Sequence, residues 1–195
     1  SFYKIFGPHM GCLDGKRELL IGTKNQGHYF FENDDITHKP NPAGPQHAMI
    51  ASLTGIADYI DALAEYHLSN PPNNLHERAI AVFELIAKHE AILAQKIVVF
   101  LTTKRNVRLI GPATGAADHR VATFSFRMNN QKSAKIPPLT ANEYVDLSSG
   151  HCYARRSIEA LRISDANDGV VRASLAHFTS EDDVEKLISV LDRIL

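Results

Sequence analysis

The sequence predicts an α/β to α+β fold in which helices pack on a small, mainly antiparallel sheet. Apolar residues recur at steps of three and four within residues 49–63 and 80–101, which is the period of an amphipathic helix. Within residues 120–127 and 170–178, apolar and polar side chains alternate instead, as they do in half-buried strands. A linker rich in Pro and Asn at residues 69–74 separates the first helix from the strands.

The part before the linker predicts a turn, a hairpin and a helix. Residues 7–11 contain two glycines and a proline, which favour a tight turn after Lys4. Residues 12–21 have the pattern of a short strand and hairpin, and the Pro-rich residues 37–45 form a loop. One face of the helix that follows is apolar and must be buried. Its apolar residues are Met49, Leu53, Ile56, Ile60 and Leu63.

The part after the linker predicts helices interleaved with strands. A long helix covers residues 75–101, and its apolar stripe runs from Ile80 and Phe83 to Leu101. The last helix begins after Thr179 or Ser180, either of which can cap it. Between these helices we expect a strand at 107–110, a strand at 120–127, a short helix from Thr140, a loop at 148–153, a helix at 155–161 and a strand at 170–178.

The composition argues against several classes of partner. The net charge is -1 and Lys and Arg are dispersed, so we expect neither nucleic acid nor an anionic membrane to bind. No apolar run reaches the ~20 residues that span a bilayer, and no signal-peptide pattern is present, so we expect a cytoplasmic protein. None of the ten histidines has the spacing of a metal site, so we predict that the chain has no metal site.

The most informative run is Ser-Phe-Tyr-Lys-Ile-Phe-Gly-Pro-His-Met-Gly, residues 1–11. It resembles the cofactor-lysine segment of the class V aminotransferase-like, pyridoxal-phosphate-dependent enzymes, the family that includes the cysteine desulfurases. In that family the lysine condenses with the cofactor aldehyde, and the cofactor ring serves as the electron sink. The resemblance makes Lys4 the catalytic and cofactor-binding lysine. Outside the resemblance, a lysine this near a terminus is usually a solvated surface charge.

The resemblance also implies the fold and the organisation of the chain. In the family, roughly the first half of the chain precedes this lysine, so the match is to the carboxy-terminal half. It implies the carboxy-terminal part of the fold-type I pyridoxal-phosphate-dependent transferase fold. Residues 1–70 would be the remnant of the cofactor-binding large domain, and residues 75–195 would be the carboxy-terminal small domain.

A second match lies near the end of the chain. Residues 169–187 are similar to the family's closing strand and helix, and by that match Arg172 holds the carboxylate of the substrate. A guanidinium suits this role, because its planar fork donates two hydrogen bonds to one carboxylate. Outside the resemblance, an exposed strand arginine or a structural ion pair would be ordinary. The turn at residues 178–180 departs mildly from the family's pattern.

Residues 149–154, Ser-Gly-His-Cys-Tyr-Ala, correspond to the loop that carries the nucleophilic cysteine in cysteine desulfurases. Cys152 falls one position early, and Tyr153 occupies the place of the nucleophile. A one-residue shift turns a side chain to another face, so we expect Cys152 to be a small buried residue. The pattern resembles a desulfurase-like subfamily without that cysteine. It implies that His151 and Tyr153 contact the substrate.

The loop at residues 41–47 resembles the one that reaches the cofactor phosphate of the partner subunit in family dimers. By this match Gly44 and Gln46 contact the cofactor. The hydroxyl residue often found there is missing, and a Gly-Pro helix start needs no ligand to explain it. Both interpretations of the loop stay open.

The implied function is the carboxy-terminal portion of an enzyme that acts on an amino acid through a lysine imine. The acidic partner of the cofactor ring, the stacking residue and the phosphate loop all precede the lysine in the family. We therefore expect this chain alone to bind pyridoxal phosphate poorly and to be inactive. The alternative is a truncated, non-catalytic binding or oligomerisation module. Either way we expect a partner, namely a second copy in a homodimer or the missing amino-terminal half.

Overall fold

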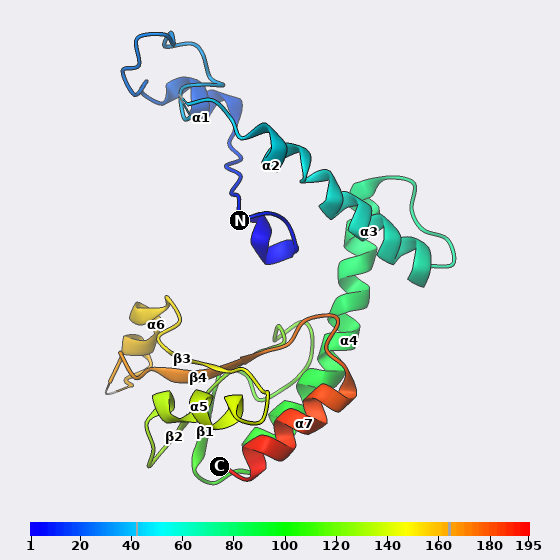
Figure 1. Ribbon diagram of the computed structural model, residues 1–195, viewed down its shortest axis with the longest axis vertical. Helices are drawn as coiled ribbons and strands as arrows, with labels where there is room; N and C mark the ends of the chain where they lie inside the picture. The colour runs from blue at the N-terminus through cyan, green and yellow to red at the C-terminus, as the bar shows by residue number, and fades with distance from the viewer. Residues whose placement is uncertain (42, 164) are drawn as a thin grey trace. The chain divides into compact units, whose positions relative to one another are not determined.

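The computed structural model describes residues 1–41, 43–163 and 165–195 and divides the chain into two compact units (Figure 1). Unit 1 is Ser1–Val82 and unit 2 is Phe83–Leu195. Pro42, which belongs to the predicted cofactor loop, lies outside the described residues. The predicted domain boundary at residues 70–75 concerns a larger enzyme and stays a prediction.

The elements of unit 1 are helical. They are a 3-10 turn η1 (Phe2–Ile5), α1 (Arg17–Gly22), α2 (His47–Ala51), α3 (Thr54–His67) and the start of α4 (Leu75–Thr103). Unit 2 combines helices with one sheet. After the rest of α4 its elements are β1 (Val107–Ile110), β2 (Thr123–Met128), η2 (Ser133–Lys135), α5 (Ile136–Ala141), β3 (Ser148–Gly150), α6 (Arg155–Ala160), β4 (Val170–Ser174) and α7 (Glu181–Asp192).

Unit 1 differs from the sequence prediction at two places. The hairpin predicted at residues 12–21 is wrong, since α1 begins there from a run of good helix formers. The helix predicted over residues 49–63 is two helices. At the break, Ser52 Oγ donates to Met49 O at 2.8 Å and Thr54 Oγ1 donates to Ala51 O at 3.0 Å. Such local hydrogen bonds compete with the helical ladder, which explains the interruption.

The sheet of unit 2 has the strand order β1-β2-β4-β3, and every neighbouring pair is antiparallel. This confirms the predicted antiparallel sheet, and β1 has the predicted bounds. The strand β3 was not predicted, because three residues are too few to show alternation. The short helix predicted from Thr140 begins earlier, at Ile136, where prolines occupy its first turn.

The core of unit 2 lies on one face of the sheet. Phe124 and Phe126 of β2 are fully buried against α4, α5 and α7. A smaller cluster, formed by Ile158 of α6, Ile163 and Val170, packs with Ile110, and Figure 1 shows α6 across the sheet from α5 and α7. The larger core is made of Leu93, Ala94, Ile97, Val98, Leu101, Phe124, Phe126, Met128, Ile136, Val171, Ala173, Val184, Leu187 and Leu191.

The long helix α4 confirms the predicted element but not the whole of its predicted apolar stripe. Ile80 and Phe83 are about half exposed, at 48% and 52%. Leu101, at the other end of the predicted stripe, is buried as expected, and Leu93 and Ile97, which lay outside the stripe, are buried with it in the core that includes the sheet and α7. Helical periodicity therefore located the helix but did not show how far along it the packed face extends.

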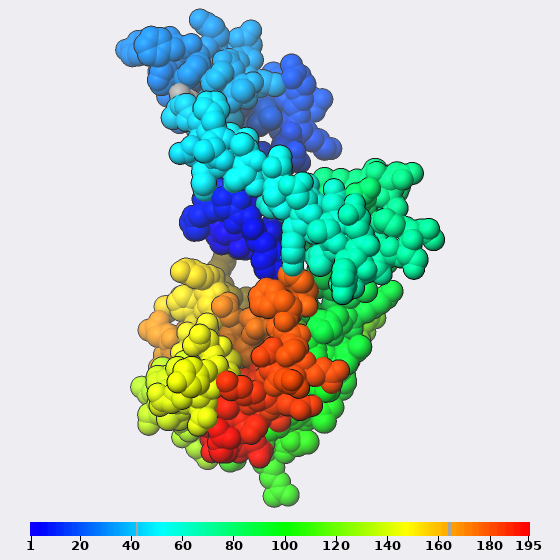
Figure 2. All heavy atoms as spheres, turned by 45° about the vertical axis from the view of Figure 1, so that its right-hand side comes forward, coloured from blue at the N-terminus to red at the C-terminus, as the bar shows by residue number. Residues whose placement is uncertain are grey.

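Helix α7 has the best-formed end in the structure. Ser180 Oγ accepts from the backbone N–H of Asp183, and the Asp183 carboxylate accepts from the backbone N–H of Ser180. This capping box confirms the predicted cap and satisfies donors that a helix start leaves free. Lys96 and Lys104 of α4 pair with Glu181 and Asp192 of α7. Figure 2 shows α7, in red, lying between α4, in green, and the yellow-green segment around α5.

The residue before β4 meets the end of β3 at very close range. Gly169 has a φ of +57° and forms a bridge with Gly150, whose φ is +112°. A Cβ at Gly169 would overlap the carbonyl group of Gly150. Glycine is therefore required at residue 169 both for its backbone conformation and for this contact.

We expect Gly169→Ala to destabilise unit 2 by more than about 1 kcal/mol, because the new Cβ meets backbone rather than a flexible side chain. Urea denaturation followed by fluorescence or circular dichroism measures the change. Ser174→Ala, at an exposed position of the same strand, should change stability by no more than about 0.5 kcal/mol. Equal stability of Gly169→Ala and the wild type would contradict the close approach.

Glu90 of α4 provides a pH-dependent test of the packing. Burial raises the pKa of this carboxyl above its ordinary value of 4.5, although His89 and the backbone amide of Ala122 oppose the shift. The folded state therefore holds the proton to higher pH than the unfolded state does. The stability that this group contributes is present below about pH 4.5 and falls as the pH rises through the raised pKa.

Accordingly, Glu90→Gln should stabilise unit 2 at pH 7 and leave its stability near pH 4 unchanged. The amide keeps the shape of the side chain but cannot ionise. Thermal melts of both proteins across this pH range measure the difference, and Glu84→Gln on the exposed face of α4 serves as the matched control. If Glu90→Gln increases the thermal stability equally at pH 7 and near pH 4, the increase does not come from the raised pKa of Glu90.

Candidate functional site

Lys4 lies on a short 3-10 turn that its own backbone closes. The Phe2 N–H donates to Met10 O at 2.8 Å, and the Gly7 N–H donates to Phe2 O at 2.9 Å. Phe6 ends the turn in the left-handed region, with a φ of +64°. The segment of residues 1–10 is thus folded back on itself around the lysine.

The turn packs on α3 within unit 1. A Cβ on Gly7 would lie 2.5 Å from Ile56 Cδ1 and 2.9 Å from Phe2 Cβ, so this contact needs glycine. The Phe6 ring contacts the Tyr59 ring, with centroids 5.7 Å apart. The backbone around Lys4 is therefore anchored to a helix.

The amine of Lys4 is exposed and carries no ion pair within the described part of the chain. Its Nζ lies 5.9 Å from the centroid of the Tyr3 ring. Tyr3 in turn stacks on His9, with centroids 4.6 Å apart and planes 10° apart. This arrangement presents a primary amine to solvent from a backbone held by packing, so the amine is accessible to an aldehyde.

Gly44 and Gln46 lie in an exposed segment ahead of α2. Gln46 is the N-cap residue of α2, and its side chain makes no capping bond. A Cβ at Gly44 would meet nothing within 4 Å. The backbone at this loop is open, and no hydrogen bond between described residues joins it to Lys4.

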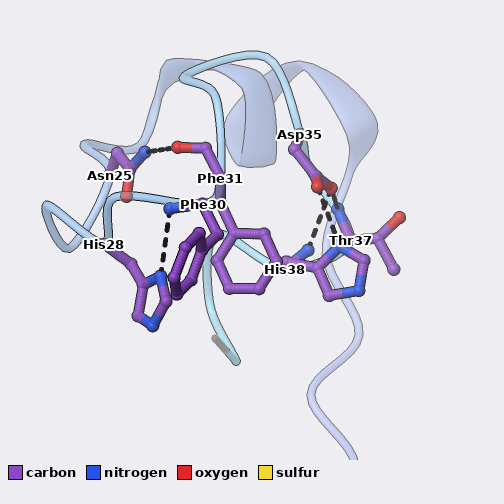
Figure 3. A network of polar contacts seen from close by, with 7 residues as sticks. All are labelled: Asn25, His28, Phe30, Phe31, Asp35, Thr37 and His38. Atoms are coloured by element: carbon purple, nitrogen blue, oxygen red, sulfur yellow. Dashed lines mark hydrogen bonds and ion pairs between the residues drawn. The ribbon is translucent and has the colours of Figure 1, made fainter. Parts of the chain in front are cut away.

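Between the lysine turn and this loop, a polar network organises residues 25–38 (Figure 3). The Asp35 carboxylate accepts from the backbone N–H groups of Thr37 and His38 and pairs with His38 Nδ1 at 2.8 Å. The His38 side chain, by this hydrogen bond, is the main reason that the pKa of Asp35 is lowered. Phe31 stacks on the His38 ring at 4.6 Å, so the network is part polar and part aromatic.

Lys39 ties this network to α1. It is only 3% exposed, and its Nζ donates to Ile21 O at 3.1 Å and Thr23 O at 3.0 Å, with Leu20 O at 3.5 Å. These carbonyls lie at the carboxy-terminal end of α1, where helix carbonyls lack helical partners and a positive charge is favourable. The sequence analysis missed this role, because the partners lie 16 to 19 residues away and no local pattern connects them.

Replacing Lys39 by Met should loosen residues 19–41, because three carbonyls lose a charged donor while the apolar stem is kept. Hydrogen bonds to charged groups contribute about 1.5 to 3 kcal/mol. Amide hydrogen exchange of this segment should accelerate accordingly. The exposed Lys24→Met is the matched control and should exchange like the wild type; unchanged protection in Lys39→Met would show that the buried ammonium is not needed.

In unit 2, Arg172 occupies the centre of β4 and is half-buried. Its register partners are Ser125 on β2 and Ser148 on β3. Its Nε is buried and has no hydrogen-bond partner among the described residues. An unpaired buried N–H costs free energy, so a group that accepts from this arginine would be stabilised there.

The loop of His151 and Tyr153 follows β3 directly. Cys152 and Tyr153 both have positive φ values, +46° and +62°, and the Tyr153 N–H donates to His151 Nδ1 at 3.2 Å. His151 Nδ1 is thus an acceptor, which leaves Nε2 to carry the proton of the neutral ring. Tyr153 is fully exposed, at 102%, and Cys152, expected to be buried, is half-buried with its Sγ 3.8 Å from Gly150 O.

The predicted site residues are divided between the two units. Lys4, Gly44 and Gln46 belong to unit 1. Arg172 and the loop of His151 belong to unit 2, where the pairing of β3 with β4 links them. No group of three potential metal ligands occurs in the described ranges. Over the same ranges, no helix has the length and apolar character to cross a membrane.

Comparison with known proteins gives a consistent result. Residues 76–187 match the model of the aminotransferase class-V family. The chain is 24% identical over 196 residues to an aminotransferase-like protein from Gibberella zeae, covering 100% of this chain and 45% of the relative. It is 26% identical over 205 residues to a probable cysteine desulfurase from Pseudomonas putida, covering 99% of this chain and 44% of the relative. The chain thus spans less than half the length of these relatives.

A solved structure is similar as well. The apo cysteine desulfurase from Thermococcus onnurineus NA1 matches with a TM-score of 0.50 and 21% identity, over 62% of this chain and 29% of that protein. This match concerns the fold. Together the comparisons confirm the predicted resemblance and the predicted carboxy-terminal part of the fold-type I architecture.

Proposed function

Because the chain belongs to the aminotransferase class-V family, we propose that it is the carboxy-terminal portion of a pyridoxal-phosphate-dependent enzyme acting on an amino acid. Lys4 is the residue that bonds to the cofactor aldehyde. The observation that carries this proposal is the geometry of the lysine turn. It holds an exposed, unpaired amine on a backbone that Gly7 packs against α3.

The residues present fit part of the cofactor. Pyridoxal phosphate, when bound, supplies an electron sink. Lys4 supplies the amine, Gly44 offers an open backbone to its phosphate, and Gln46 offers a side chain that makes no capping bond to α2. Partners for the ring nitrogen and for the ring face would come from the half of the relatives that this chain does not span.

Arg172 would bind the substrate carboxylate. Its buried, unpaired Nε is explained if an anion accepts from it. His151, with the proton on Nε2, can donate to a polar group of the same substrate, and Tyr153 presents an exposed hydroxyl from the same turn. Cys152 has no assigned role, since its thiol faces the backbone of its own loop.

The chain alone would be folded but inactive, because transition-state stabilisation depends on preorganised groups that it lacks. We propose that it works with the missing half or as a homodimer, in a cytoplasmic setting where Cys12 and Cys152 stay free thiols. A non-catalytic binding module derived from the family is the second candidate.

Reductive labelling tests the role of Lys4. After incubation with pyridoxal phosphate and borohydride, peptide mapping should find the label concentrated at Lys4. Lys4→Ala should lose that label, whereas Lys24→Ala, which removes an exposed lysine of the same unit, should keep it. Label spread evenly over the exposed lysines would contradict the assignment of Lys4 as the cofactor-binding lysine and would favour the non-catalytic binding module.

A further inference from the structure

The turn of residues 151–153 has a backbone conformation that is unfavourable by itself. Cys152 and Tyr153 follow one another in the left-handed region, with φ values of +46° and +62°. Residues with a side chain adopt this conformation at a cost in free energy, so the surrounding structure must impose it. In this conformation the Tyr153 N–H donates to His151 Nδ1 at 3.2 Å. Contacts that hold the turn therefore also orient the imidazole ring.

The segment of residues 165–169, which leads into β4, contacts both ends of this turn. At the first end, Gly169 packs on the backbone of His151, whose N would lie 2.7 Å from a Cβ added at Gly169. At the other end, Arg155 Nη1, on the first residue of α6, donates to Asn167 Oδ1 at 3.0 Å. The turn is thus held between two contacts made by one short segment.

Asp168 anchors this segment to the rest of unit 2. It is only 8% exposed, and its two carboxylate oxygens accept from the backbone N–H groups of Ser133 at 3.0 Å and Ala134 at 3.2 Å. Ser133 Oγ donates in turn to Gly169 O at 3.3 Å. The two N–H groups begin η2, where backbone donors lack partners within the helix, so the carboxylate caps η2 from a distant part of the chain. A buried carboxylate is costly unless it is hydrogen-bonded, which favours this one arrangement.

The same segment is closed on itself by Asp165. Its Oδ1 accepts from the N–H groups of Asn167 at 3.1 Å and Asp168 at 3.2 Å, and its carbonyl accepts from the Gly169 N–H at 3.0 Å. The backbone N–H of Asp168, and then that of Asn167, lower the pKa of Asp165, so this carboxylate stays an acceptor at neutral pH. The contacts of Asn167 and Gly169 are therefore fixed relative to the anchor at Asp168.

We propose that Asp168 and Asn167 are positioning residues, which hold the turn of residues 151–153 in the conformation that presents His151 to the substrate. The inference rests on the proposed function, in which His151 donates to a polar group of the substrate. Asp168 acts at the start of the turn through the glycine next to it, and Asn167 acts at the end of the turn through its bond to α6. Both contacts are needed, because each fixes one end of a backbone that is strained on its own.

The ¹⁵N chemical shift of His151 Nδ1 tests this proposal in the full chain, because the shift depends on whether the nitrogen accepts a hydrogen bond. It is measured at about pH 8.5, above the ordinary range in which histidine titrates, and His151→Gln identifies the signal by its loss. Asn167→Ala and Asp168→Ala should move the shift most of the way to its value in the urea-unfolded chain. The Tyr153 amide should exchange about tenfold faster, the effect of losing one ordinary hydrogen bond.

Conservative variants separate the bonds from the bulk of the side chains. Asn167→Asp keeps an oxygen for Arg155 and should behave like the wild type, whereas Arg155→Ala should reproduce Asn167→Ala. The double alanine variant should be no worse than either single one, because both substitutions remove the same bond. Asp168→Asn keeps one of the two acceptors and should give an intermediate shift, and it serves as the test if Asp168→Ala does not fold.

Two matched controls distinguish positioning from general stability. Glu159→Gln changes the other partner of Arg155, whose Nε lies 2.9 Å from Glu159 Oε1, and should leave the His151 shift unchanged. Val184→Ala opens a cavity in the core of unit 2, where Val184 is fully buried, and should lower the stability without changing the shift. A shift that follows the stability of every variant, Val184→Ala included, would show that Asp168 and Asn167 act on stability alone and would overturn the proposal.

An unchanged His151 shift in folded Asn167→Ala and Asp168→Asn would overturn it as well. So would a wild-type shift equal to that of the unfolded chain, because the turn would then not hold the ring. The labelling of Lys4 tests the proposed function separately, since none of these substitutions lies in unit 1. The expected combination is a labelled Lys4 in every variant and a His151 shift that is lost only where the turn is released.

Discussion

The burial of Phe124 and Phe126 against α4 and α7 is the interaction on which unit 2 depends. Each is fully buried, and a buried Phe contributes about 1.5 to 3 kcal/mol. Because the side-chain period of a strand is two, fixing these rings also fixes Ser125 on the opposite face. The register with β4 then sets Arg172 beside it. A slip of one residue would bury the arginine and expose the rings, so the core determines which face of the sheet carries Arg172.

Unit 1 holds its lysine turn by a different route, since the described residues there form no sheet. The lysine turn is held by close contact, with Gly7 against Ile56, and by backbone bonds within residues 1–10. The next segment is held by a buried ammonium, that of Lys39, and by the pair of Asp35 and His38. Polar contacts and tight turns thus replace the apolar core that α1 and α2 are too short to build.

Local patterns in the sequence predicted the elements whose own residues carry the signal. The long helix α4, the alternating strand β2 and the capped start of α7 all follow from spacings within a few residues. Prediction failed where partners are distant or elements are short. Strand β3 has three residues, α1 replaced a predicted hairpin, and the burial of Lys39 depends on carbonyls far back in the chain. The predicted roles of Lys4 and Arg172 came from resemblance, whereas the bonds of Asp168 join residues far apart in the chain and required the structure.

The lysine turn of unit 1 and the strand of Arg172 in unit 2 have a common physical property. The lysine turn and the strand that carries Arg172 are each held by packing within their own unit. Binding groups preorganised in this way lose little freedom when a ligand arrives, so they can keep affinity even without the rest of an active site. Rate acceleration is different, because it needs charges placed around the reacting atoms from all sides. Packing within each unit can therefore hold an amine or a guanidinium in position, whereas catalysis depends on further charges around the reacting atoms.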